Sequence, residues 1–188
     1  MNKRLLTLSV IVLSAAMARV LPHPPNVTPI AAMALFGGAY LFNRKLAFLL
    51  PLSAMFLSDL GLWALGQVPL PGQQSVWVYA GFSLTVCLGF LLRQHRRVLP
   101  IAGATLASAV LFYLVTNFGV WATGALYPRT VAGFAACYTA AIPFFRNMLL
   151  GDVWYVALLF GGFALMEKWF PVLREPELIG LNVVPRGV

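Results

Sequence analysis

The chain has 188 residues, of which 61% are hydrophobic and only 10% are charged. Soluble globular domains carry about 25% charged residues, so this composition excludes that class and predicts an integral membrane protein. The formal net charge of +8 does not indicate a nucleic-acid partner, because that requires a clustered basic face on a soluble fold. Here the basic residues lie in short runs between apolar segments, as at the flanks of membrane spans.

The first apolar segment runs from Leu5 to Val20, after the basic start Met1-Asn-Lys-Arg4. A basic start, an apolar run and the small residues Ala16-Met17-Ala18 are also the features of a cleaved signal peptide. We expect a retained helix, because the run is long enough to span a membrane with little tilt.

A proline-rich connection, Arg19-Val-Leu-Pro-His-Pro-Pro-Asn-Val-Thr-Pro29, follows the first segment. Proline fixes φ and has no backbone donor, so the four prolines predict a stiff, non-helical loop. Such a loop either presents His23 and Asn26 to a ligand or only ends two helices.

The rest of the chain predicts five further spans, which gives six in a single all-α transmembrane domain over residues 1–188. A polar connection or a basic run separates most of these spans. Pro51 is expected to kink the span in which it lies. A further apolar segment, broken at Pro143, is expected to lie on the outer face without crossing. The spans are Ile30 to Phe42, Leu46 to Gly66, Ser75 to Leu92, Val98 to Thr123 and Arg146 to Met166, and the outer segment is Val131 to Phe145.

The distribution of basic residues predicts that both termini lie in the cytoplasm. This orientation leaves only Arg19, Arg129 and Arg146 of the 13 Lys and Arg residues outside, in agreement with the positive-inside rule. We therefore expect a multi-pass protein of the bacterial cytoplasmic membrane, in contact with lipid.

Most of the polar side chains inside the predicted spans fall in their outer half. A buried charge is costly unless it is paired, so these residues either form interhelical pairs, such as Asp59 with Arg19 or Arg146, or line a polar cavity open to the outside. With the loop residues they form the candidate binding set: Arg19, His23, Asn26, Asp59, Tyr79, Asn117, Trp121, Arg146 and Asp152.

Catalytic and metal motifs are weak in this sequence. It contains no His-Glu-x-x-His, no Gly-x-Ser-x-Gly and no phosphate-binding loop. Cys87 and Cys137 both lie in apolar context and indicate neither a metal site nor a disulfide framework. We expect a binding protein rather than an enzyme, with no resident cofactor; an intramembrane enzyme that uses His23 is the least favoured alternative.

Four motifs resemble a family of small bacterial proteins assigned to transport and catalogued as of unknown function. They are the loop Arg19–Pro29, Ala34-Leu-Phe-Gly-Gly38, Thr116-Asn-Phe-Gly-Val-Trp121 and Ala141-Ile-Pro-Phe-Phe-Arg-Asn147. That family is related to the substrate-binding S components of energy-coupling-factor (ECF) transporters. The resemblance implies six helices, an outward ligand cavity and docking on an energising module through small residues of the first helix, here Ser14 and Ala18.

The nearest group in this resemblance is the solitary cobalamin S component. It implies a vitamin-type ligand, with cobalamin as the first candidate, and matches His23, Asp59, Tyr79 and Arg146 to residues around the cobalt. This chain reads Gln73-Gln74-Ser75 where that group has a cobalt-ligating cysteine, which leaves His23 as the candidate cobalt ligand. The contrasting hypothesis is a structural or assembly protein whose outer charges only hold helices together.

Overall fold

The structure is a computed structural model that describes residues 2–68, 73–124 and 126–174, and these residues form helices and connections without a strand. The predicted loop around residues 69–72 and the tail beyond Arg174 lie outside the described residues. The helices are α1 (Lys3–Ala18), α2 (Ile30–Tyr40), α3 (Arg44–Ala64), α4 (Gln73–Leu91), α5 (Val98–Thr123), α6 (Val131–Ala140), α7 (Ile142–Val156), the π-helical turn η1 (Ala157–Gly161), α8 (Gly162–Trp169) and the 3-10 turn η2 (Pro171–Leu173).

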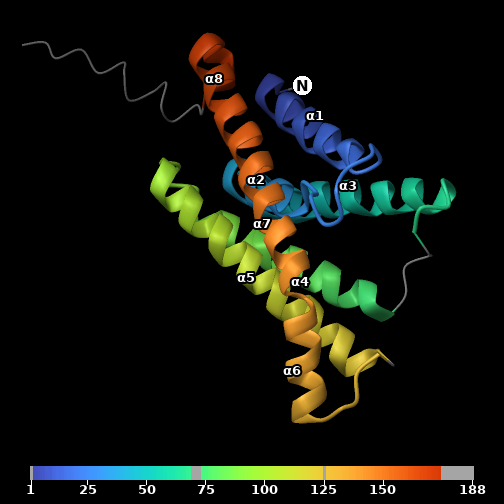
Figure 1. Cartoon of the computed structure of the whole chain (residues 1–188). Coiled ribbons are helices and arrows are strands. Elements are labelled where there is room, and N and C mark those ends of the chain that lie inside the picture. Colours follow the sequence, from blue (N-terminus) through green and yellow to red (C-terminus); the bar gives the residue numbers. More distant parts are fainter. Residues whose placement is uncertain (1, 69–72, 125, 175–188) are drawn as a thin grey trace, which may run out of the picture.

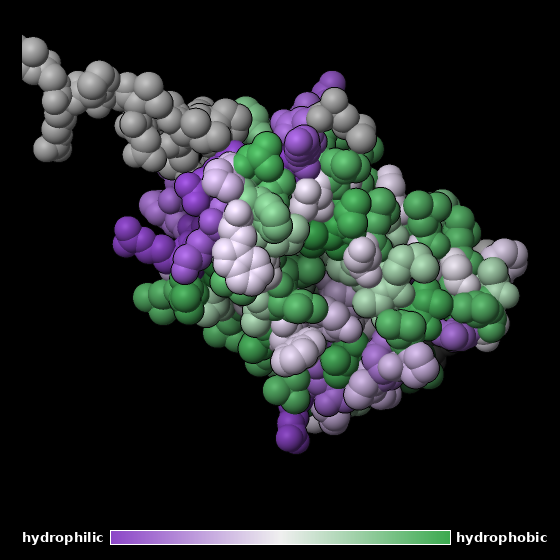
Figure 2. Space-filling view, turned by 90° about the horizontal axis from the view of Figure 1, so that it is seen from above, coloured by the Kyte–Doolittle hydropathy of each residue, from purple (hydrophilic) through white to green (hydrophobic). Residues whose placement is uncertain are grey.

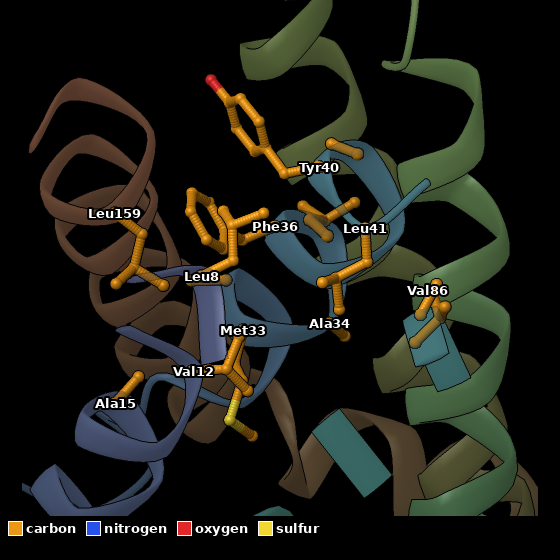
Figure 3. Close-up of a cluster of buried hydrophobic side chains, with 14 of the residues drawn as sticks. Leu8, Val12, Ala15, Met33, Ala34, Phe36, Tyr40, Leu41, Val86 and Leu159 are labelled. Atoms are coloured by element: carbon orange, nitrogen blue, oxygen red, sulfur yellow. The ribbon is translucent and has the colours of Figure 1, made fainter. Parts of the chain in front are cut away.

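The short helix α2 lies at the centre of the bundle, with α1, α3, α4, α5 and α7 packed around it (Figure 1). Every residue from Ala31 to Leu41 is buried. Figure 3 shows Leu159 of η1 on one side of Phe36 and Val86 of α4 on the other. An uncharged helix of small and apolar residues is suited to burial on all sides. Its 11 residues rise only about 16 Å, so α2 does not cross a bilayer core by itself.

Two glycines bring α2 and α4 into backbone contact. A Cβ atom added to Gly38 would lie 2.3 Å from the carbonyl oxygen of Val86 and 2.9 Å from Cα of Gly89. A Cβ atom added to Gly89 would lie 2.6 Å from the carbonyl oxygen of Leu35. Small residues allow this close approach of apolar helices, which supplies packing that lipid cannot replace.

Three helices of the described part are long and apolar enough to cross a membrane: α3, α5 and the continuous helix Ile142–Trp169, which comprises α7, η1 and α8. The predicted all-helical, apolar architecture is therefore present. Helix α3 runs without interruption through Pro51, whose ring lies where a Cβ of Gly37 would be.

The predicted outer segment Val131 to Phe145 is divided between α6 and the first turn of α7, with a single non-helical residue, Ala141, between them. Figure 1 shows α6, α7 and α8 following one another along one side of the molecule. Helix α6 packs on the end of α5, because the rings of Tyr138 and Phe134 contact those of Tyr113 and Trp121. The segment thus extends the last helix rather than forming a separate layer.

Arginines gather where α2 ends. Arg93 donates to the carbonyl oxygens of Gly38 (3.0 Å) and Leu41 (2.7 Å), and these carbonyls belong to the unpaired C-terminal end of a helix, where a cation is favourable. Arg4 pairs with Glu167 at 2.7 Å and joins the first helix to the last. Seen from the end where α8 and the start of α1 lie, the largest group of hydrophilic side chains lies on the left, smaller groups lie at the other edges, and hydrophobic surface covers much of the rest (Figure 2).

Candidate functional site

A buried ion pair joins the end of α1 to α3. Arg19 is the C-cap residue of α1, and its Nη2 lies 2.8 Å from Oδ1 of Asp59. The two side chains are only 10% and 16% exposed, so the charges interact in a low-dielectric environment. Arg19 Nη1 also donates to the hydroxyl of Ser58 and to the carbonyl oxygen of Met55 at 3.3 Å.

Tyr79 extends this ion pair to α4. Its hydroxyl donates to the second carboxylate oxygen of Asp59 at 2.6 Å. Each oxygen of Asp59 therefore has a partner, and α1, α3 and α4 are linked through one carboxylate. We call Arg19, Ser58, Asp59 and Tyr79 the outer network. The carboxylate of Asp59 is thus satisfied within the network, whereas Nε of Arg19 is buried without a hydrogen-bond partner among the described residues.

The proline-rich loop lies beside the outer network. His23 places Nε2 3.2 Å from the carbonyl oxygen of Arg19 and Nδ1 3.0 Å from that of Pro24. Both ring nitrogens thus face backbone carbonyls, and coordination of a metal through either one requires that contact to be given up. Asn26 has φ of 62°, in the left-handed region that asparagine tolerates better than most residues.

Helix α7 holds the same loop from the other side. Asn147 Nδ2 donates to the carbonyl oxygen of Pro25 at 3.2 Å, and a Cβ on Gly151 would lie 2.9 Å from Cα of Val27. Arg146 is exposed near the start of α7, and the ion pair of Asp59 is made with Arg19 instead.

Asp152 is a deeply buried polar side chain of the predicted set with an unsatisfied oxygen. It is 1% exposed, and its Oδ2 is buried without a hydrogen-bond partner among the described residues. The residue follows Gly151, so it lies on α7 next to the point where the helix touches the loop. A buried carboxylate oxygen without a partner carries the full cost of desolvation.

The remaining predicted residues hold α5 to α6. Asn117 Nδ2 donates to the carbonyl oxygen of Tyr113 within α5 at 2.8 Å, and the backbone carbonyl oxygen of Asn117 accepts from the thiol of Cys137 in α6 at 3.6 Å. Trp121 Nε1 donates to the carbonyl oxygen of Pro128 at 3.1 Å. The structure therefore gathers Arg19, Asp59 and Tyr79, with His23 beside them, and assigns Asn117 and Trp121 to a different contact.

Two features escaped the sequence reasoning. Asn147 contacts the loop, whereas the predicted binding set contains only its neighbour Arg146. A cavity of about 680 Å³ also lies between α5 and the α7–α8 helix, lined by apolar residues with Arg96 and Tyr40 at its edge. None of the predicted binding residues lines it. Its walls are ordinary apolar positions, so no local sequence signal distinguishes them from a packed helix interface.

Comparison with known proteins gives one match. The model of a family described as "Family of unknown function (DUF6580)" matches residues 1–173. No curated protein and no solved structure matches the chain. The match covers nearly all of the described residues, including the loop, the outer network and Asp152.

Proposed function

We propose that this chain, which belongs to the DUF6580 family of unknown function, is a multi-pass membrane protein that binds a small molecule at its outer face for uptake. The role is one of binding, not catalysis, and an ECF-type energising module is the partner that would supply the energy. The proposal is supported by the sequence pattern and by the environment of Asp152.

The proposed topology has six crossings with both termini in the cytoplasm. Helices α3, α5 and α7–α8 have the length and apolar character of spans. In the proposed topology α1 and α4 make two further crossings, and the short α2 makes the sixth together with the connections at its two ends. Helix α6, which α7 follows after a single residue, is proposed to lie at the outer face without crossing, so that α7 and α8 make the last crossing. The bacterial cytoplasmic membrane is the proposed location because the basic residues follow the positive-inside rule.

Cysteine labelling tests this topology. In a background without Cys87 and Cys137, we expect single cysteines at Gln73 and Arg129 to react with an impermeant maleimide in intact cells. A cysteine at Gln94 should react only after permeabilisation. Labelling of Gln94 from outside would reverse the orientation and place the outer network in the cytoplasm.

The observation that carries a binding role is the unpartnered Oδ2 of Asp152, which is buried in α7 and directly follows Gly151, the residue that contacts the loop. Natural proteins rarely leave a buried acceptor unsatisfied, and exceptions concentrate at functional positions. The loop next to it contains Pro24 and Pro25 and is fixed by Asn147, so it loses little conformational freedom when a ligand binds. Asp152 and this loop are the proposed contact region.

The proposed ligand class is a vitamin-type molecule, with cobalamin as the first candidate. This choice rests on the sequence resemblance to cobalamin S components. His23 is the residue that would bind cobalt, and to do so it must exchange a backbone contact of its ring for the metal. Imidazole is a suitable ligand for first-row transition metals.

Binding of hydroxocobalamin to the purified full chain tests the ligand, by equilibrium dialysis and absorption spectroscopy. We expect saturable binding by the parent and a shift of the absorption bands that is lost in His23→Ala. We expect Asp152→Leu to lose binding while its melting temperature rises, because the substitution removes a buried acceptor whose desolvation costs about 1–3 kcal/mol.

Ligand binding and the melting temperature together distinguish a functional role of Asp152 from a structural one. Unchanged binding with a lower melting temperature would make Asp152 a structural residue and remove the main support for the site. Arg146→Gln provides a control for the melting temperature, because Arg146 is exposed. No binding by the parent would exclude cobalamin, and mass spectrometry of the protein purified from rich medium then identifies any retained ligand.

One observation favours a second candidate, a structural or assembly protein. The outer network is closed, with both oxygens of Asp59 occupied by Arg19 and Tyr79, which is what an interhelical lock requires. In this alternative the purified chain carries no small molecule, and the outer charges contribute only to stability.

A further inference from the structure

An apolar groove opens between α5 and the last helix, away from the predicted binding residues. Its volume is about 680 Å³, within the range of pockets that hold drug-sized ligands. Ile101 and Leu106 of α5 form one wall, and Val153, Ala157 and Gly161 contribute to the other. If α5 and the last helix packed fully against each other, their side chains would fill this space. The space is instead open over several turns of the two helices.

The wall on the last helix contains the π-helical turn η1, Ala157–Gly161. A π-helical turn is rare in proteins and often marks a functional position. Its residues Ala157, Phe160 and Gly161 all line the groove. A Cβ atom added to Gly161 would have no neighbour within 4 Å, so the groove is open at this point.

One end of the groove is polar and basic. Arg96 and Tyr40 line it there, and the guanidinium carbon of Arg96 lies 4.5 Å from the centre of the Tyr40 ring. Arg96 belongs to the run Arg93-Gln-His-Arg-Arg97, which the proposed orientation places at the cytoplasmic surface. A long apolar groove with a cation at the level of lipid headgroups is complementary to an anionic amphiphile.

We propose that the groove binds an acyl chain of an anionic phospholipid whose phosphate pairs with Arg96. Basic pockets between transmembrane helices on the cytoplasmic side are known to bind anionic headgroups. The lipid would hold α5 against the last helix without entering the outer site. The inference depends on the membrane location but not on the ligand of the outer site.

Native mass spectrometry of the full chain in mild detergent tests the headgroup, with dioleoylphosphatidylglycerol and dioleoylphosphatidylcholine as probes. We expect one phosphatidylglycerol to be retained, about fivefold in preference to phosphatidylcholine, as expected for one cationic side chain. Arg96→Gln should abolish the preference, and Arg96→Lys should keep it. Equal retention of the two lipids by the parent would overturn the proposal.

Two neighbouring glycines test the groove independently of Arg96. Gly161→Leu fills the groove and should reduce retention of phosphatidylglycerol at least fivefold. Gly162→Leu is the matched control, because Gly162 also has open space around it but does not line the groove, and it should bind as the parent does. Equal retention by the two variants would place the lipid elsewhere. A dimer that dissociates in Gly161→Leu would make a second copy of the chain the occupant and would also overturn the proposal.

Discussion

Replacing Gly38 with alanine should remove about 3 kcal/mol of stability, although the change adds a single methyl group. The new Cβ would lie 2.3 Å from the carbonyl oxygen of Val86 and 2.9 Å from Cα of Gly89. Both neighbours are backbone atoms of α4, so no side chain can rotate away and the two helices must separate. Overpacking of a tight interior typically costs 1–3 kcal/mol. Thermal unfolding in detergent measures the loss.

The double variant Gly38→Ala/Gly89→Ala identifies the mechanism. Once the first methyl group has forced α2 and α4 apart, the second meets less resistance, so the combined loss should be smaller than the sum of the two single losses. Gly162→Ala is the control, because its Cβ would enter open space. Alanine in a helix is favoured over glycine by about 0.5–1 kcal/mol, so this variant should melt higher. A Gly38→Ala protein that melts like the parent would show that α2 and α4 adjust freely.

The proximity of Arg19 and Asp59 could be predicted from the sequence, because the level of a residue along a helix follows from counting residues. Arg19 at the end of one apolar run and Asp59 late in another are expected near the same membrane surface. The structure brings them to 2.8 Å and thereby selects between Arg19 and Arg146, the two partners that the sequence left open. Tyr79 joins them because α4 begins at that surface.

The same counting gives less information about the basic residues that lie near the end of α2. Arg93 and Arg96 were interpreted only as membrane flanks, because a short basic run after an apolar segment has that meaning in general. Their contacts arise because α2 ends at Tyr40, so its last carbonyls become available to Arg93 and its final ring to Arg96. Contacts that depend on where one helix ends relative to another leave no periodic pattern in the sequence.

The last helix shows a similar limit. Pro143 correctly indicated a break, and the structure begins α7 at Ile142. The sequence nevertheless did not predict that α6 continues toward α7 along α5, because that direction depends on the ring contacts of Phe134 and Tyr138 with α5. The π-helical turn at Ala157–Gly161 also has no residue signature, since its residues are those of an ordinary apolar helix.

Neutralising Asp59 should destabilise the protein by about 3 kcal/mol, the lower end of the cost of breaking a buried ion pair. Asp59→Asn leaves the guanidinium of Arg19, in a side chain that is only 10% exposed, without its counter-charge. It also weakens the hydrogen bond from Tyr79, because charged acceptors bind more strongly than neutral ones. Thermal unfolding of the variant measures the effect, with Arg146→Gln as the exposed control.

The double variant Arg19→Met/Asp59→Leu separates the cost of a broken pair from the value of an intact one. Replacing both charges with apolar residues of similar size is often neutral or stabilising, so this protein should regain most of the stability lost in Asp59→Asn. If the outer network contacts the ligand, the double variant should be folded but should fail to bind the molecule that the parent retains. If the network is only a lock between α1 and α3, binding survives. An Asp59→Asn protein that melts with the parent would contradict both readings, because the pair would then neither hold the helices nor lie in a dry environment.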